Sequence, residues 1–169
     1  FNVVFILFIL TLLNGVLAVI LIPAAFLIMA KAGSQPEGLG RLLSLVQSGN
    51  PTIAVLAAAL FMAVCGGLNG TASSTYSREG AQFWISKIIP VSPTDQAKGK
   101  FLHSYAVVVL GLAAATAVLA FIFEMKASLL LAALILAALA GVVMTAMGMM
   151  IDLARPLLTW INPQKAIKQ

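Results

Sequence analysis

The chain has 169 residues, of which 62% are hydrophobic and only 9% are charged, and its mean hydropathy is +1.07. Soluble domains carry about 25% charged residues, so the composition excludes a soluble globular domain. The formal net charge of +5 arises from Lys and Arg residues placed between apolar stretches. That placement favours a role in membrane orientation over binding to nucleic acid.

Long uncharged stretches predict an all-α polytopic transmembrane bundle, since about 20 apolar residues cross the hydrocarbon core as a helix. A single transmembrane domain, residues 1–169, is expected to hold four spans at about residues 3–30, 52–72, 104–123 and 127–151. A tight polar turn at 124–126 should join the last two spans into an antiparallel hairpin. Because the chain begins without Met and ends soon after a basic stretch, we expect a fragment of a longer protein.

The basic residues divide unequally between the two sides of such a bundle. One side collects Lys31, Arg41 and Lys126. The other collects Arg78, Lys87, Lys98, Lys100, Arg155, Lys165 and Lys168. The positive-inside rule therefore predicts that the loop at 76–102, the tail at 152–169 and both chain ends face the cytoplasm, in a multi-pass protein of the cell membrane.

The sequence offers no recognisable catalytic, metal or cofactor site. The nearest approach to a phosphate-binding loop is Gly99-Lys100-Phe101, which lacks the upstream glycine and the hydroxyl residue. A zinc site needs clustered ligands, but the single histidine, His103, and the single cysteine, Cys65, are far apart. We interpret His103 as an interfacial residue rather than a proton relay, and Cys65 as a packing residue. We therefore expect no enzyme activity in this chain.

Two features of the predicted spans concern packing and energy supply. The motifs Gly66-x-x-x-Gly70 and Ala137-x-x-x-Gly141 predict small-residue faces at which helices approach closely. No charged residue lies deep within a predicted span, whereas ion-coupled transporters keep ionisable groups near the membrane midplane. If the chain takes part in transport, we expect the energy to come from a partner.

The loop at 76–102 has the clearest local pattern. Phe83, Trp84, Lys87 and Ile88 cluster at helical spacing and predict a short amphipathic helix. Its simplest interpretation is a helix lying at the membrane interface, anchored by Trp and Lys. The functional interpretation is a docking surface for a cytosolic protein, because exposed aromatics beside charges suit insertion into a groove.

A second helix should begin at the far end of this loop. Ser92 suits an N-cap, Pro93 the first helical position and Asp95 the third. This helix is expected to run toward His103, parallel to the membrane, and then to enter it. The pattern of the loop therefore predicts a helix, a break and a second helix.

Two motifs resemble a known family. The first comprises Ser77-Arg78-Glu79-Gly80, then Phe83-Trp84-Ile85-x-Lys87-Ile88-Ile89-Pro90-Val91-Ser92-Pro93, then Gly99-Lys100. The second is Asp152-Leu153-x-Arg155-Pro156-x-Leu158-x-Trp160-x-Asn162-Pro163-Gln164-x-Ala166-x-Lys168-Gln169. Both resemble segments of bacterial ATP-binding-cassette (ABC) exporter permeases of the type 2 class, and they occur in the expected order and on the predicted cytoplasmic side.

The resemblance implies a membrane-spanning subunit that couples ATP hydrolysis by a separate subunit to export. In that family six spans form a permease half, and the loop between the second and third spans carries a coupling helix that contacts the nucleotide-binding ATPase. The candidate contact residues carried over are Arg78, Glu79, Gly80, Phe83, Trp84, Lys87, Pro90, Ser92 and Pro93. ATP and Mg would belong to the ATPase, and a second permease half or a homodimer mate would complete the substrate path within the lipid.

The chain departs from this family in having four predicted spans rather than six, and nothing in it identifies the cargo. The alternative is a membrane scaffold or sensor without transport activity, which recruits a cytosolic partner through the same loop.

Overall fold

The computed structural model describes residues 24–25, 28, 41, 44–47, 49–67 and 70–159, and within these ranges it contains helices and no strand. The long helices are α3 (Pro51–Gly67), α5 (Pro93–Ile122) and α6 (Ala127–Ala154). Between α3 and α5 lie two 3-10 helices, η1 (Ala72–Ser74) and η2 (Ser77–Gln82), and the short helix α4 (Ile85–Ile88). The predicted span at 3–30 and the tail beyond residue 159 fall almost wholly outside the described residues.

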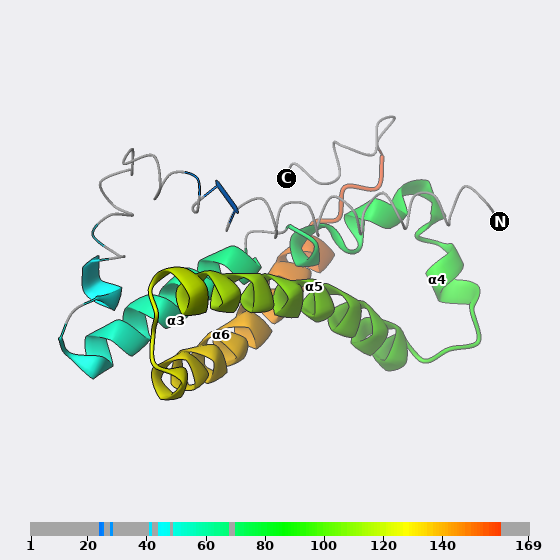
Figure 1. Ribbon diagram of the computed structural model, residues 1–169. Coiled ribbons are helices and arrows are strands. Elements are labelled where there is room, and N and C mark those ends of the chain that lie inside the picture. The colour runs from blue at the N-terminus through cyan, green and yellow to red at the C-terminus, as the bar shows by residue number, and fades with distance from the viewer. Residues whose placement is uncertain are drawn as a thin grey trace.

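In the described part of the chain, three helical stretches are long and apolar enough to cross a membrane: Pro51–Gln82, Pro93–Phe121 and Ala127–Ala154. With 30 residues, α5 measures about 45 Å, which exceeds a hydrocarbon core of about 30 Å. The prediction of an all-helical membrane protein is thus supported at the level of fold class. The chain direction in Figure 1 shows α3 and α6 running the same way and α5 running against them.

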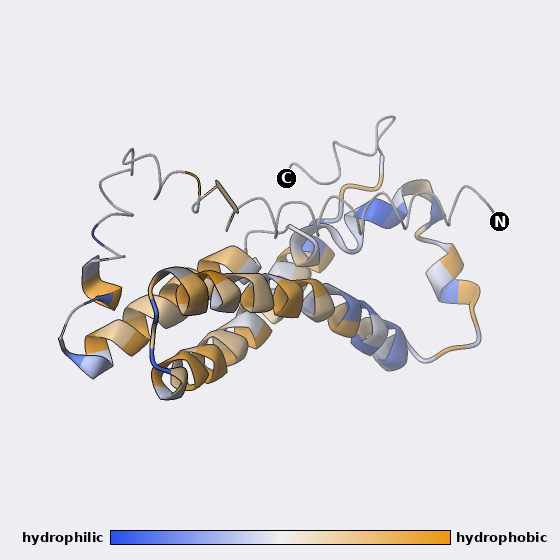
Figure 2. Cartoon of the chain, viewed as in Figure 1, coloured by the Kyte–Doolittle hydropathy of each residue, from blue (hydrophilic) through white to orange (hydrophobic). Residues whose placement is uncertain are grey.

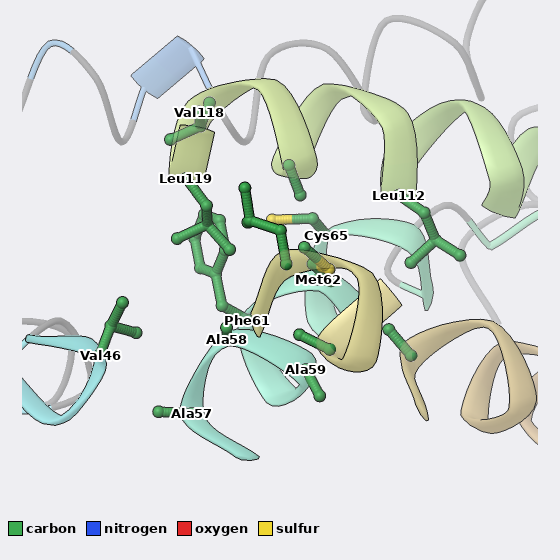
Figure 3. Packing of buried hydrophobic residues seen from close by; sticks show 14 of the residues in the cluster. Val46, Ala57, Ala58, Ala59, Phe61, Met62, Cys65, Leu112, Val118 and Leu119 are labelled. Carbon is green, nitrogen blue, oxygen red and sulfur yellow. The ribbon is translucent and has the colours of Figure 1, made fainter. Parts of the chain in front are cut away.

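The three long helices pack against one another around a core of small and medium side chains. Figure 3 shows Met62 and Cys65 of α3 facing Leu112 and Leu119 of α5. Large apolar side chains also cover the outside of the bundle, where Phe121 is 85% exposed, and Figure 2 shows the apolar colour on these helices. An apolar exterior is what a lipid environment favours.

Two glycines allow a close contact between α3 and α5. A Cβ atom on Gly111 of α5 would lie 2.7 Å from the Cα of Gly66 in α3 and 3.0 Å from the carbonyl oxygen of Cys65. The backbones of α3 and α5 can therefore approach this closely only because Gly111 lacks a side chain, and a Cβ on Gly66 would also be tight, at 3.1 Å from the Val108 carbonyl oxygen. The predicted packing role of Gly66 is confirmed.

The other small-residue predictions have mixed outcomes. Ala137 is fully buried, and a Cβ on Gly141 would lie 2.9 Å from Val108, so this pair does form a helix interface. Gly70, in contrast, lies beyond the end of α3 and has a φ of +63°, and among the described residues no atom would lie within 4 Å of a Cβ added there. It serves the turn after α3 and takes no part in helix packing.

The start of α5 agrees with the predicted cap. The Ser92 hydroxyl accepts a hydrogen bond from the Asp95 amide at 3.1 Å and donates one to the Asp95 carboxylate at 2.7 Å, and Pro93 is the first helical residue. The helix α5 continues unbroken past His103 to Ile122, so no interruption of the helix marks the point at which the predicted surface helix enters the membrane. A change from polar to apolar side chains alters the environment of a helix but leaves its backbone hydrogen bonds intact.

The end of α6 also differs from the sequence expectation. The predicted fourth span ended at residue 151 and assigned Asp152 to the tail, whereas α6 continues to Ala154 and includes Asp152 in its last turn. The turn before α6 is as expected: residues 123–126 connect α5 to α6, with Glu124 at a φ of +48°.

Candidate functional site

Residues 70–92 form a polar connector between α3 and α5. Its first part lies against the bundle, since η1 packs on α6 and α5. The hydroxyls of Ser73 and Ser74 donate to the Gly70 carbonyl at 3.2 and 2.9 Å. Thr75 donates to the Thr71 carbonyl at 2.8 Å and lies 3.2 Å from the hydroxyl of Ser104 in α5. These bonds satisfy the polar groups that the connector brings onto the apolar bundle.

Asp152 of α6 binds the middle of the connector. Its residue exposure is 2%, and its Oδ2 accepts hydrogen bonds from the backbone amides of Tyr76 at 2.5 Å and Ser77 at 3.1 Å. Its Oδ1 accepts a bond from the Ser77 hydroxyl. A buried carboxylate needs such donors, because an unpaired charge in a low-dielectric site is strongly unfavourable.

Arg78 is also bound within the chain. Its Nε donates to the Ser74 carbonyl at 3.2 Å, and its terminal nitrogen donates to the Thr71 carbonyl at 3.1 Å. The Arg78 guanidinium therefore stabilises the fold of the first residues of the connector by binding two of their backbone carbonyls.

Glu79 joins the connector to α5. Its Oε1 lies 2.5 Å from the Nζ of Lys100, and this ammonium also lies 4.3 Å from the centre of the Tyr76 ring. Both charged side chains are mostly covered, with 20% exposure for Lys100 and 29% for Glu79. Within the described residues, the buried Oε2 of Glu79 has no hydrogen-bond partner.

After Gly80 the chain leaves the bundle, and α4 has no buried residue. Trp84 is 58% exposed and Ile88 is 67% exposed, and Lys87 beside them is exposed, with its ammonium 5.8 Å from the Phe83 ring centre. Figure 1 shows α4 set apart from the three long helices. This short helix thus presents an apolar surface with a positive charge.

The far end of the connector is tied to α5 by Gln96. Its side-chain amide donates to the carbonyl of Ser86 in α4 at 2.9 Å and to that of Val91 at 3.0 Å. Ile89 is extended, so the chain turns sharply between α4 and the Ser92 cap. Although α4 has no buried residue, the Gln96 bond to Ser86 attaches it to the first turn of α5.

Two grooves flank the connector. One, of about 360 Å³, lies between α4 and the start of α5 and includes Phe83, Lys87, Gln96 and Lys100 in its lining. The other, of about 560 Å³, lies between α5 and α6 and includes Phe101, Leu102, Met149 and Met150. Tyr76 and Leu153 line both grooves, so the two adjoin beside the Asp152 anchor.

The predicted contact residues fall into two groups. One group is engaged in shaping the chain: Arg78, Glu79 and Gly80 hold the connector, while Ser92 and Pro93 begin α5. The other group lies at the surface: Trp84, Lys87 and Pro90 are exposed and Phe83 is half-buried, and Ser92 and Pro93 of the first group are exposed as well. A partner can therefore reach the motif residues from 83 to 93 more readily than Arg78, Glu79 and Gly80, which are half-buried or buried.

Two residues that organise this region have roles that the sequence did not predict. The sequence placed Asp152 at the start of the tail and in the second motif, and Lys100 only in the first motif. The available signal for Asp152 was a single acid at the end of an apolar run, which requires donors nearby. The sequence alone does not reveal that those donors come from residues 76–77.

Within the described residues, no three His, Cys, Asp or Glu side chains are grouped so that they could hold a metal ion. Comparisons with protein-family models, with curated proteins and with solved structures give no match.

Proposed function

We propose that this chain is part of the membrane-spanning permease of an ATP-driven exporter, and that α4 is the surface to which a separate nucleotide-binding ATPase docks. The observation that carries the proposal is the combination of an exposed aromatic helix with a firm attachment to the bundle. Trp84 and Ile88 project from α4, while Gln96, Lys100 and Asp152 tie the two ends of the connector to α5 and α6.

The character of α4 suits a protein partner. Interfaces are centred on large aromatic residues that fill a pocket, with charges at the rim. Trp84 supplies the aromatic anchor, and Lys87 supplies a positive charge one helical turn away. The ATPase would therefore present an apolar groove with acidic residues at its edge.

The attachments offer a mechanical path from this surface into the membrane. Movement of α4 would be passed to α5 through the Gln96 bonds and through the Glu79–Lys100 ion pair. Since α5 is one continuous helix from Pro93 to Ile122, a displacement of its polar end would also move the end on the other side of the bilayer. A second permease half would form the substrate path together with this chain. Closure of a pair of ATPase subunits could thus open this path to one side of the membrane and then to the other.

The test is purification of the protein from its native membrane in mild detergent, with identification of co-purifying proteins by mass spectrometry. A stoichiometric ATPase should be present with the wild type. Trp84→Ala should weaken its binding by about 2 kcal/mol or more, roughly 30-fold, because an aromatic anchor is lost. Lys87→Glu should also weaken binding if acidic residues face it.

Leu139→Ala is the matched control, since Leu139 is 61% exposed but lies midway along α6, outside the connector and α4. It should retain the ATPase. Glu79 is less suitable for this test, because changing it also breaks the ion pair with Lys100.

A wild-type preparation without an ATPase would overturn the proposal and favour the scaffold or sensor alternative. Quenching of Trp84 fluorescence by brominated lipids, measured with Trp160 replaced by Phe, would instead assign α4 to the membrane interface.

A further inference from the structure

The carboxylate of Asp152 has both oxygens occupied by the connector. Oδ2 receives the amides of Tyr76 and Ser77, and Oδ1 receives the Ser77 hydroxyl. The Ser77 oxygen in turn accepts a bond from the Leu157 amide at 2.9 Å, from a residue beyond the end of α6. Ser77 is therefore bound on both sides by the C-terminal end of α6.

The hydrogen bonds to the Asp152 carboxylate are expected to be stronger than those between neutral groups. An ionised acceptor shortens and strengthens a hydrogen bond, and burial removes competing water. The residues concerned, Asp152 and Ser77, have 2% and 0% exposure. The connector is therefore fixed to α6 only a few residues before the chain turns out toward α4.

The connector also has a separate attachment to α5 through Glu79 and Lys100. One short segment is thus joined to two helices that run in opposite directions. Loss of the Glu79 pair would leave the α6 attachment in place, and loss of Asp152 would leave the α5 attachment in place.

We propose that Asp152 is a positioning residue that fixes the middle of the connector to α6, so that force applied at α4 reaches α6 as well as α5. The attachment itself is independent of any partner. Only the source of the force rests on the proposed function.

The first test is hydrogen exchange of the full chain in lipid nanodiscs. Asp152→Asn keeps the side-chain size but replaces one acceptor oxygen with a donor and removes the charge. The amides of Tyr76 and Ser77 should then exchange at least about tenfold faster, because they lose charged acceptors. Asp95→Asn is the control, since Asp95 is an exposed acid on α5, and it should leave these two amides unchanged.

A second measurement separates positioning from general support of the fold. Spin labels at Lys87 and Met150, with Cys65 replaced by Ala, report the distance between α4 and α6. Asp152→Asn should broaden this distribution. A label pair at Leu60 and Leu139, which reports on α3 and α6 within the bundle, should keep the wild-type width.

If Asp152→Asn broadened the distance distributions of both label pairs, Asp152 would only support the fold, and the proposal would be overturned. The proposal would also be overturned if Asp152→Asn had the same exchange rates and distances as the wild type. If that variant does not fold, the distance measurement is made on Ser77→Ala, which removes the bonds from Ser77 Oγ to Oδ1 and from the Leu157 amide but keeps the carboxylate and its two amide bonds, and which should broaden the same distribution. Failure of the proposed function would appear differently, as a wild-type preparation without an ATPase while the exchange and distance results persist.

Discussion

At Gly80 the backbone adopts a φ of +52° and a ψ of −133°, a conformation that side chains with a Cβ rarely adopt. This residue lies between the anchored part of the connector and the exposed α4. Its geometry sets the direction in which the chain leaves the bundle. A glycine is therefore required here for conformational reasons, independently of any partner contact.

Gly80→Ala should strain the connector by about 1–3 kcal/mol, since alanine is disfavoured at this φ and ψ. Opening of the connector should become easier, and trypsin should cleave after Lys87 roughly tenfold faster in nanodiscs. Ala81→Gly, at the exposed neighbouring position, is the control and should change the rate little. Equal cleavage of Gly80→Ala and wild type would contradict a strained role for this residue.

Individual residues also show where prediction from sequence ends. The Ser92, Pro93 and Asp95 cap was predicted correctly because its contacts lie within four residues and follow from helix geometry. The role of Asp152 was not predicted, because its donors lie about 75 residues away in the chain. Long-range pairing of this kind depends on how the helices cross, which local sequence does not specify.

Among the elements, the crossing of α3 and α5 depends on backbone contact between Gly66 and Gly111. Interfaces of this kind rely on close packing, since lipid chains are as apolar as the helices themselves. Because the connector joins the end of α3 to the start of α5, this crossing also affects where Lys100 of α5 meets the connector.

Gly111→Ala should destabilise the bundle by about 1–3 kcal/mol, because its Cβ would overlap the Gly66 backbone. Gly99→Ala, in the same helix, is the matched control: its Cβ would meet open space, and it should be neutral or stabilising by about 0.5–1 kcal/mol. Unfolding of both variants by detergent titration, followed by circular dichroism, would test the difference. If Gly111→Ala were as stable as Gly99→Ala, the close crossing would be refuted.

The element boundaries were predictable to the extent that composition follows them. The turn at 123–126 and the start of α6 coincide with a charged interruption, and they were located correctly. The span expected to start at 104 begins inside α5, and no break in the helix marks that position, because it was inferred from a change in hydropathy alone. Hydropathy reports on the surroundings of a helix and does not define where it begins.

For the whole molecule, the positive-inside rule predicts that the connector and the start of α5 face the cytoplasm, while the turn at 123–126 faces outward. Thr94→Cys and Lys126→Cys, each with Cys65 replaced by Ala, occupy exposed positions at these opposite ends. An impermeant thiol reagent added to intact cells should label the cysteine at 126 and leave the cysteine at 94 unmodified until the cells are permeabilised. The reverse pattern would invert the orientation and remove α4 from reach of a cytosolic ATPase.

The overall architecture and the location of the candidate site could be predicted more readily than its internal arrangement. Apolar runs indicated the long helices, and the aromatic cluster around Trp84 indicated an exposed short helix. The division of the motif into anchoring residues and exposed residues depends on tertiary contacts, as the Glu79–Lys100 pair illustrates.

The glycine crossing divides α5 unequally. Pro93 lies about 27 Å from Gly111 along the helix axis, and Ile122 lies about 17 Å beyond it. If the helix tilts about this crossing as a seesaw tilts about its fulcrum, the two ends move in opposite directions. The Ile122 end then travels about six-tenths as far as the Pro93 end, with a correspondingly larger force. A displacement applied at the polar end would thus become a smaller movement with greater force at the apolar end.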